Sequence, residues 1–453
     1  MNHHPMKKIW MLILPLALLT AGAVRGQEAA SERALRLSLS DAVARALSEG
    51  TAARLSSLSI EASQNRAAQA RSALRPQVGG ELRVASDMVN LKTFGFAPPG
   101  VPSVVGPFDV IDAHVNFAWE VINLAARRRY AAALAGVRVS EEDRRRTENE
   151  VAAAVATLYV AVERGTARIE GIRANVDLFE KLRVLAFDRQ KAGTGTRIDT
   201  TRADLQLARQ RQALLVAENQ RNVAQLALLR AVGADLGTTE VVLTDDETRA
   251  QSTPAALPTV EAALATAREA RPELRTLIER LRAAQLAERA ARAQKLPRLA
   301  LTAQAAESGN YVRDLSWTRS INAVASVPLF TGRRIEEQVA EARIQQQEIT
   351  EQQRDLERQI EQEVRQALLV LDNARSRVTL AEQSVRLAED ELEVARDRFQ
   401  NGVASSIEVD NAQTSLATSR DTRIDALADV AQARFDLARA TGEIRQLIPG
   451  RSS

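Results

Sequence analysis

The spacing of apolar side chains changes along the chain between a helical period and an extended one. Over Leu39–Leu74 and over Val260–Leu296, apolar residues recur at the 3.6-residue spacing of an amphipathic helix. Pro76 ends the first of these stretches and Pro297 ends the second. The pattern therefore predicts one helix near the start of each half of the chain.

After each proline the spacing of apolar residues becomes two, which predicts strands with one apolar and one polar face. Ile111–Val121 alternates without interruption, whereas Phe94–Pro107 is rich in Pro and Gly and predicts a loop. The four predicted strands span residues 78–90, 108–121, 298–306 and 316–329. Strands of about ten residues cross a bilayer in tilted barrels that enclose a wet lumen. A soluble sheet with one buried face shows the same alternation, so this alternative stays open.

Aromatic residues lie near the ends of the predicted strands, where a membrane-facing aromatic girdle would lie. They are Phe117, Trp119, Trp317 and Phe330. Four strands do not close a barrel, and an open strand edge cannot face lipid. If the strands span a membrane, several chains must each contribute four of them. Two chains would give eight strands and three would give twelve.

Two proline-free stretches of roughly 70 residues follow the strands, at Asn123–Ala192 and Gly332–Asn401. As helices, each would be about 105 Å long at 1.5 Å per residue. Their apolar seam is thin and rich in Ala, which favours close coiled-coil packing. A return helix follows each of them and ends at Gly233 or Gly442. The arginines that open the long helices either lie against lipid headgroups or form a solvated first turn.

The reversal between each long helix and its return helix occurs twice in similar sequence. Ala186–Leu207 and Ala395–Leu416 lie 209 residues apart and share seven of 22 residues, which indicates an internal duplication. Gly193 and Gly402 occupy the position where a helix C-terminus needs a left-handed residue. We therefore expect an antiparallel helical hairpin in each half, with its tip at 193 or at 402.

Each reversal also carries the signature of a helix start. Thr196 and Asp199, and likewise Ser405 and Glu408, have the spacing of a capping box. The sequence therefore predicts that both return helices are capped in the same way.

The composition excludes several classes of site. The chain has no cysteine, so disulfides, thiolate metal sites and a cysteine nucleophile are excluded. Met1–Gly26 combines Lys7 and Lys8 with an apolar run and small residues, which predicts a secretory signal peptide cleaved after Ala23 or after Gly26. The three basic residues of this segment account for the whole formal net charge of +3. The mature chain is then close to neutral, and its charge does not support a nucleic-acid partner.

An enzyme needs chemical groups that converge, and the sequence offers few of them. His114 lies on the polar face of a predicted strand, and the other histidines belong to the signal peptide. We expect His114 to face a lumen rather than to bind a metal. The sequence has no phosphate loop, metal-ligand spacing or nucleophile elbow. We therefore expect no catalytic residue, no cofactor and no metal.

The order of elements resembles the TolC family of outer-membrane efflux proteins over essentially the whole mature chain. The resemblance is carried by the two Arg-x-x-x-Gly reversals, at Arg189 and Arg398, and by Val327–Arg334, which is similar to the family's PLF-x-G junction. In the first half, Glu120–Arg127 departs from that junction but keeps the order of elements. The resemblance implies a mainly helical fold in which duplicated halves form long antiparallel coiled-coil hairpins. It also implies four transmembrane strands per chain, joined in a homotrimer as a twelve-stranded barrel above an α-helical tunnel.

The resemblance also implies partners and site residues. The family forms the outer duct of tripartite efflux pumps and of type I secretion systems. It extends from outer-membrane lipid across the periplasm to an adaptor protein and, through the adaptor, to an inner-membrane transporter. The residues that would face the adaptor at the tips are Arg189, Gly193, Thr194, Arg398, Gly402 and Val403. The pore would narrow at Glu408 and at Asn411, where the family has an acid and this chain does not.

These expectations divide the chain into a signal peptide (1–26), a first repeat (27–233), a linker (234–258), a second repeat (259–442) and a tail (443–453). The linker contains one short predicted strand, Glu240–Leu243. The expected function is an efflux duct in the outer membrane, with a secretion duct as an alternative. A periplasmic coiled-coil tether, from another class of protein, would leave the amphipathic strands unexplained. The few side chains of a wide lumen do not encode the exported substrate.

Overall fold

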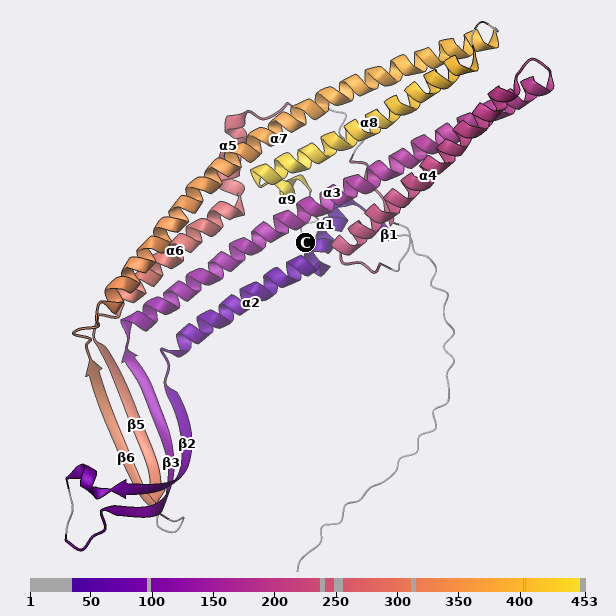
Figure 1. The fold of residues 1–453 in the computed structure, drawn as a ribbon. Helices are drawn as coiled ribbons and strands as arrows, with labels where there is room; N and C mark the ends of the chain where they lie inside the picture. The colour runs from indigo at the N-terminus through magenta and orange to yellow at the C-terminus, as the bar shows by residue number, and fades with distance from the viewer. Residues whose placement is uncertain are drawn as a thin grey trace, which may run out of the picture.

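The computed structural model of this 453-residue chain describes residues 35–95, 99–236, 241–247, 256–310, 315–401, 403 and 405–448. The predicted signal peptide lies outside the described residues, as do residues 449–453 of the predicted tail. The described chain is elongated, with a sheet at one end and the tips of two helical hairpins at the other (Figure 1).

Two helices run through nearly the whole helical part of the molecule. They are α3 (Leu124–Lys191, 68 residues) and α7 (Arg334–Gln400, 67 residues), close to the predicted ranges. Toward the tips, α4 (Arg197–Ala231) returns along α3, and α8 (Ser406–Thr441) returns along α7 (Figure 1). Because α8 also packs on α3, the order across the tip half is α7, α8, α3, α4.

On the sheet side, α3 and α7 pack against other helices instead of the return helices. Here α2 (Thr51–Ser72) packs on α3, and α6 (Pro272–Ala293) packs between α3 and α7. The sequence predicted single helices over Leu39–Leu74 and Val260–Leu296, and this prediction is wrong, because each stretch forms two helices. α1 (Leu39–Glu49) precedes α2, and α5 (Val260–Ala270) precedes α6.

The two helix breaks have different physical causes. A side chain at Gly50 would place its Cβ 2.1 Å from the carbonyl oxygen of Ala46, so the first break depends on glycine. In the second, Pro272 has no amide proton to donate and holds Arg271 in an extended conformation, with ψ 119°. The helical periodicity passes through both breaks, which is why the spacing of apolar residues did not reveal them.

The four long strands form one antiparallel sheet in the order β2 (Gln77–Asn90), β3 (Val104–Ile122), β5 (Arg298–Gly309) and β6 (Ser316–Ser326). The two hairpins of the duplicated halves are joined by β3 and β5, which place Trp119 opposite Leu301. Within the described residues, β2 and β6 each pair on one side only, so the sheet has two open edges.

The strand ends differ from the predicted ones. β3 begins at Val104, so the end of the predicted loop is strand. A short 3-10 helix, η1 (Leu91–Phe94), ends at the first residue of that loop. β5 extends to Gly309 rather than to residue 306. β6 ends at Ser326 rather than at residue 329, because Pro328 cannot donate a ladder hydrogen bond.

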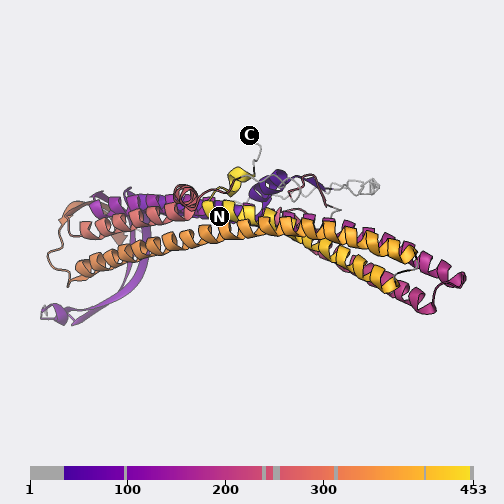
Figure 2. The ribbon, with the colours of Figure 1, turned by 90° about the horizontal axis from the view of Figure 1, so that it is seen from above.

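A second, small sheet lies halfway along the helices, where β1 (Leu35–Leu37) pairs in parallel with β4 (Val241–Leu243). The short strand predicted in the linker is therefore present within its described residues. Together with α1, α5 and α9 (Ile444–Leu447), this sheet forms a region that we call the waist, residues 35–49, 241–247, 256–270 and 443–448. Figure 2 shows α1 and α9 on the same side of the helical layer.

The hydroxyl of Tyr159 ties the waist to α3. It lies 3.2 Å from the carbonyl oxygen of Leu37 and 3.3 Å from that of Asp245, and it accepts a hydrogen bond from the amide of Asp245 at 3.2 Å. The Tyr159 side chain is completely buried, and burial raises the pKa of its hydroxyl. The neutral phenol therefore acts here as a hydrogen-bonding anchor between the two segments of the small sheet.

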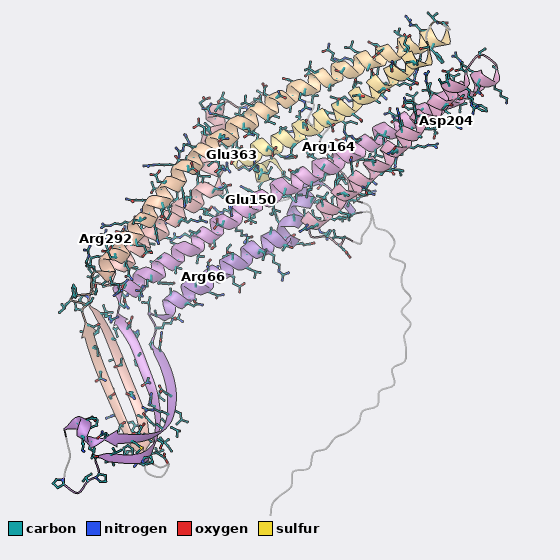
Figure 3. The ribbon with its side chains drawn as sticks, viewed as in Figure 1. Arg66, Glu150, Arg164, Asp204, Arg292 and Glu363 are labelled. Carbon is teal, nitrogen blue, oxygen red and sulfur yellow. The ribbon has the colours of Figure 1, made fainter. Side chains whose placement is uncertain are left out.

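Charged side chains lie along the helices (Figure 3), and ion pairs join neighbouring helices from the sheet side to the tips. Near the tips, Arg183 on α3 pairs with Asp204 on α4. At the waist, the buried Arg271 pairs with Glu363 on α7. None of the helices in the described ranges combines the length and the apolar character needed to cross a bilayer.

Candidate functional site

The first helical tip is closed by the carbonyl group of Arg189. This oxygen accepts hydrogen bonds from the amides of Thr194, at 2.9 Å, and Gly195, at 3.0 Å. Gly193 has the left-handed conformation that the reversal requires, with φ 77°. On the far side of the turn, the amide of Thr196 donates to the carboxylate of Asp199 at 3.1 Å, so the acidic half of the predicted capping box is confirmed.

The second tip repeats the turn but not the cap. The carbonyl oxygen of Arg398 accepts a hydrogen bond from the amide of Val403 at 2.9 Å, while Gly402 lies outside the described residues. Within the described part of this tip, the side chain of Ser405 makes no capping hydrogen bond. The carboxylate of Glu408 instead lies 3.1 Å from Nε of Arg398, so the predicted second capping box is wrong. A guanidinium within reach attracts the carboxylate more strongly than a neutral amide does.

The two tips also contact each other through a residue that the sequence analysis did not single out. The guanidinium of Arg189 lies over the ring of Phe399, 4.0 Å from its centroid. Such a cation–π contact links the end of α3 to the end of α7. The signal was present in the duplicated sequence, because Phe399 directly follows Arg398, whereas Gln190 follows Arg189.

Polar and charged side chains also lie just behind the tips, at the starts of α8 and α4. Asp410 is half-buried, and burial raises the pKa of its carboxyl group, opposed by the nearby charge of Arg202 and reinforced by that of Asp199. The neighbouring Asn411 is exposed and lines an open groove of about 590 Å³ with hydroxyl side chains of α8, including Thr414 and Thr418. Glu408 and Asn411 therefore both lie on accessible surface at the start of α8.

The sheet separates apolar from polar side chains. Large apolar residues on one face are exposed, such as Val78, at 70%, and Ile321, at 72%. The opposite face carries His114, whose ring nitrogens lie 3.4 Å from Glu81 and 3.5 Å from Asp112. Large apolar side chains of this face are left exposed within the described chain, as expected of a surface that another phase or another molecule covers.

The four predicted girdle residues lie near the two ends of the sheet. Trp119 lies at the helix side, where its indole donates to the carbonyl oxygen of Leu74 at 3.2 Å. Phe117 pairs with Val78 on the same side, and Phe330 follows β6 there with 89% of its surface exposed. Trp317 lies at the far end of β6 and is 61% exposed.

No group of three or more His, Asp or Glu side chains in the described ranges is arranged to hold a metal ion. The candidate functional surfaces are therefore the tips and the two-faced sheet, connected by about 100 Å of helix. In this arrangement the sheet can insert into a membrane and the tips can contact another protein.

The model of the family described as "Outer membrane efflux protein" matches residues 42–234 and 263–443 of this chain. The chain belongs to the outer membrane efflux protein family. The two matched segments correspond to the two repeats, and the gap between them contains β4. The family resemblance, the efflux function and the outer-membrane location predicted from the sequence are thereby confirmed.

Individual relatives agree with this assignment. The pyoverdine export outer membrane protein OpmQ of Pseudomonas aeruginosa is 24% identical over 84% of this chain and 80% of its own. The outer membrane efflux protein BepC of Brucella suis is 24% identical over 96% of this chain and 90% of its own.

Solved channel structures have the same fold. The outer membrane protein VceC of Vibrio cholerae matches with a TM-score of 0.72 and 21% identity, over 89% of this chain and 96% of its own. The CmeC outer membrane channel of Campylobacter jejuni matches with a TM-score of 0.75 and 18% identity, over 89% of this chain and 85% of its own. The family and these neighbours are channel proteins.

Proposed function

We propose that three copies of this chain form a closed efflux duct, in which twelve strands make a barrel in the outer membrane and the helices continue it as a tunnel. The observation that carries this proposal is the pair of open edges on the four-stranded sheet, at β2 and β6. Unpaired strand edges cannot face lipid, so a sheet that enters the membrane must close with further copies. The exposed apolar face would contact lipid and the polar face would line the lumen.

The helices supply a second argument for closure. At one lateral edge, α7 exposes Leu380, Leu387 and Val394, with exposed fractions of 62%, 61% and 58%. Their seven-residue spacing is that of a coiled-coil seam. At the opposite edge, α4 exposes Leu205 and Val223 (Figure 1). When copies stand side by side, α7 of one meets α4 of the next and both apolar stripes are covered.

The tips are the end that would meet a periplasmic adaptor and, through it, an inner-membrane transporter. Arg189, Thr194, Arg398 and Val403 are the described residues of this proposed surface, and Gly193 allows the chain to turn there. In the closed ring, Glu408 and Asn411 would narrow the tunnel from three sides. Support for the efflux partners comes from membership of the efflux family and from the names of OpmQ and BepC.

The mass of the purified protein in mild detergent tests the proposal, with light scattering to separate protein from detergent. We expect three times the mass of one chain. Leu387→Glu, in the α7 stripe, should shift the protein toward single chains, because it places a charge in the seam. Arg386→Glu, next to it and off the stripe, is the matched control and should leave the assembly intact. A monomeric or dimeric mass for the parent protein would overturn the proposal.

A further inference from the structure

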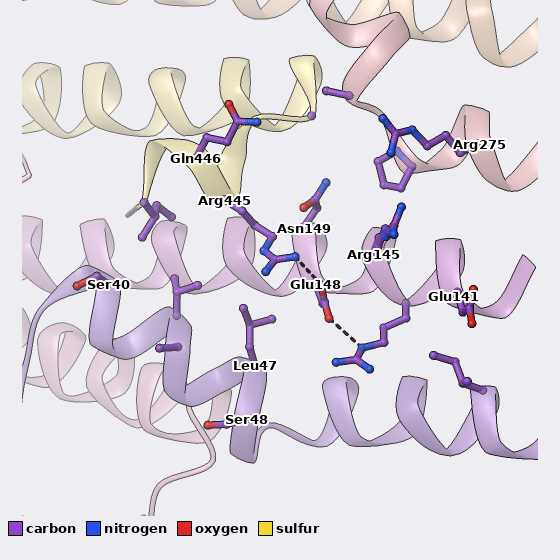
Figure 4. A pocket seen from close by; sticks show the side chains of 18 residues that line it. Ser40, Leu47, Ser48, Glu141, Arg145, Glu148, Asn149, Arg275, Arg445 and Gln446 are labelled. Atoms are coloured by element: carbon purple, nitrogen blue, oxygen red, sulfur yellow. Dashed lines mark hydrogen bonds and ion pairs between the residues drawn. The ribbon is translucent and has the colours of Figure 1, made fainter. Parts of the chain in front are cut away.

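An open cleft of about 960 Å³ lies at the waist, between α3 and the short helices that cover it (Figure 4). Its walls come from α1, α2, α3, the end of α5, the start of α6, and α9 with the turn before it. The volume is in the range of pockets that bind small ligands. The cleft belongs neither to the tips nor to the sheet, and the proposed duct assigns it no role.

The charge of the cleft is unbalanced. Four arginines line it against two glutamates, which leaves an excess of two positive charges. Apolar side chains, including Val43, Leu47 and Ile60, cover another part of the wall. The surface therefore favours a ligand that is anionic at one end and apolar at another.

The cleft already contains one carboxylate, which belongs to the chain itself. Glu148 lies between two guanidiniums from different elements, with Arg144 on α3 at 2.9 Å and Arg445 on α9 at 2.5 Å (Figure 4). Its side chain is only 15% exposed. Arginines that converge on a carboxylate in this way bind it through charge-assisted hydrogen bonds.

A second pair of arginines, Arg145 and Arg275, lines the same cleft. In Figure 4, Arg145, from α3, and Arg275, from α6, are drawn on the side of the cleft away from Arg445, and no ion pair is marked from either to the residues drawn. Arg145 pairs with Glu142 on its own helix at 2.8 Å, and Arg275 donates to the carbonyl oxygen of Glu269 at 2.7 Å. A guanidinium has five N–H donors, so these contacts leave donors of both arginines for a ligand.

We propose that the waist cleft binds a polycarboxylate, with one carboxylate held between Arg145 and Arg275 in the way that Glu148 is held between Arg144 and Arg445. The arginines are largely exposed, so water and salt weaken each ion pair. Useful affinity therefore requires several carboxylates that bind together. Free polycarboxylates and acidic segments of a protein share this chemistry, and the experiment below separates them.

Titration calorimetry of the full-length protein in mild detergent tests the proposal with two probes, citrate and a hexaglutamate peptide. We expect saturable binding that weakens as salt is raised. Arg275→Gln and Arg145→Gln should each weaken binding roughly tenfold, which corresponds to one charge-assisted interaction. Arg268→Gln is the matched control, because it removes the same charge from α5 outside the cleft, and it should leave the affinity unchanged.

A variant that should bind more tightly separates a specific effect on the site from loss of binding through misfolding. Glu148→Gln releases Arg144 and Arg445 and adds one net positive charge, so it should bind hexaglutamate more tightly than the parent does. Tighter binding of hexaglutamate than of citrate indicates an acidic protein segment, and the reverse indicates a free anion. Absence of saturable binding by both probes would overturn the proposal, as would equal weakening by Arg275→Gln and Arg268→Gln. Neither result depends on whether three copies close the duct.

Discussion

The two helical tips have similar sequences, but different contacts hold them. In the first tip, Asp199 accepts the amide of Thr196 and caps its helix. In the second, the equivalent Glu408 pairs with Arg398 instead. The guanidinium of Arg189, the counterpart of Arg398, lies over the ring of Phe399 in the other hairpin. Equivalent spacing therefore conserves the turn, while the neighbouring side chains decide which partner each charge takes.

The sheet-side helices show the same divergence. In the first repeat, α2 meets α3 through a neutral contact, a hydrogen bond of 2.7 Å between Ser63 and Ser140. In the second, α6 meets α7 through a charged one, in which Glu288 contacts Arg343 at 3.0 Å. The two repeats share a backbone plan, but within the described residues only the second makes this contact with an acid.

The helix breaks at the waist provide the largest expected difference between the repeats. Gly50→Ala should destabilise the protein by about 3 kcal/mol, because the new Cβ overlaps the Ala46 carbonyl. Pro272→Ala should cost less, since alanine adopts the extended and helical conformations on either side of that break. Thermal unfolding followed by circular dichroism in detergent measures both. Equal losses would show that the two breaks are equivalent.

The first tip should be sensitive to backbone strain. Gly193→Val should cost about 2 kcal/mol, because a β-branched residue is forced to a positive φ while nothing else lies within 4 Å of its Cβ. Gly193→Asn is the control, since asparagine tolerates the left-handed region. The same unfolding measurement should rank the two, and a valine variant as stable as the asparagine variant contradicts the strain argument.

The charged contact of the second repeat predicts a pH dependence. Hydrogen bonds from Gln346, Arg343 and Arg292 lower the pKa of Glu288 from 4.5 to about 2. A carboxyl group with a depressed pKa stabilises the folded chain above its unfolded pKa, so this contribution is complete above about pH 4.5 and is lost between about pH 4.5 and pH 2. Glu288→Gln should lower the free energy of unfolding by about 1 to 2 kcal/mol at pH 7. It should also weaken the dependence of that free energy on pH below about pH 4.5. Ser63→Ala, in the neutral contact, should leave that dependence unchanged.

The caps of the two return helices predict a smaller difference. Asp199→Ala should lower the free energy of unfolding by about 1 kcal/mol, because the helix loses its cap. Glu408→Ala should cost less, because it removes only an exposed ion pair. Hydrogen exchange at the first turn of each helix distinguishes them, with faster exchange expected after Asp199→Ala. Equal acceleration in both variants would mean that Glu408 is a cap after all.

The contact between the tips has the smallest expected effect. Phe399→Leu should cost about 0.5 kcal/mol, since the cation–π contact of Arg189 is at the surface. Phe399→Trp should keep the contact. A double-mutant cycle with Arg189→Gln measures the coupling between the two side chains, and a coupling energy of zero would contradict a stabilising role.

Much of the architecture could be predicted from the sequence, because its periods are long and repeated. The helices that became α3 and α7 contain no proline, and the alternation at Ile111–Val121 predicted the C-terminal part of β3. The breaks at Gly50 and Pro272 were missed because the apolar spacing continues through them.

The details of the site were less predictable, because they depend on residues distant in sequence. The contact of Arg189 with Phe399 joins two repeats, and the choice of Glu408 between an amide and Arg398 depends on side-chain distances. The waist cleft combines residues from six helices, and neither motif nor periodicity brings them together.

The parallel pairing of β1 with β4 has a consequence for the order of folding. Leu35 at the start of the described chain pairs with Val241, more than 200 residues later. Since synthesis proceeds from the N-terminus, β1 has no β4 to pair with until the entire first repeat has been synthesised. Such distant pairing makes folding slow and leaves a strand edge exposed in the meantime. The nascent chain therefore passes through a stage in which its first repeat is complete in sequence but its waist is open, and a holding chaperone would protect it at that stage.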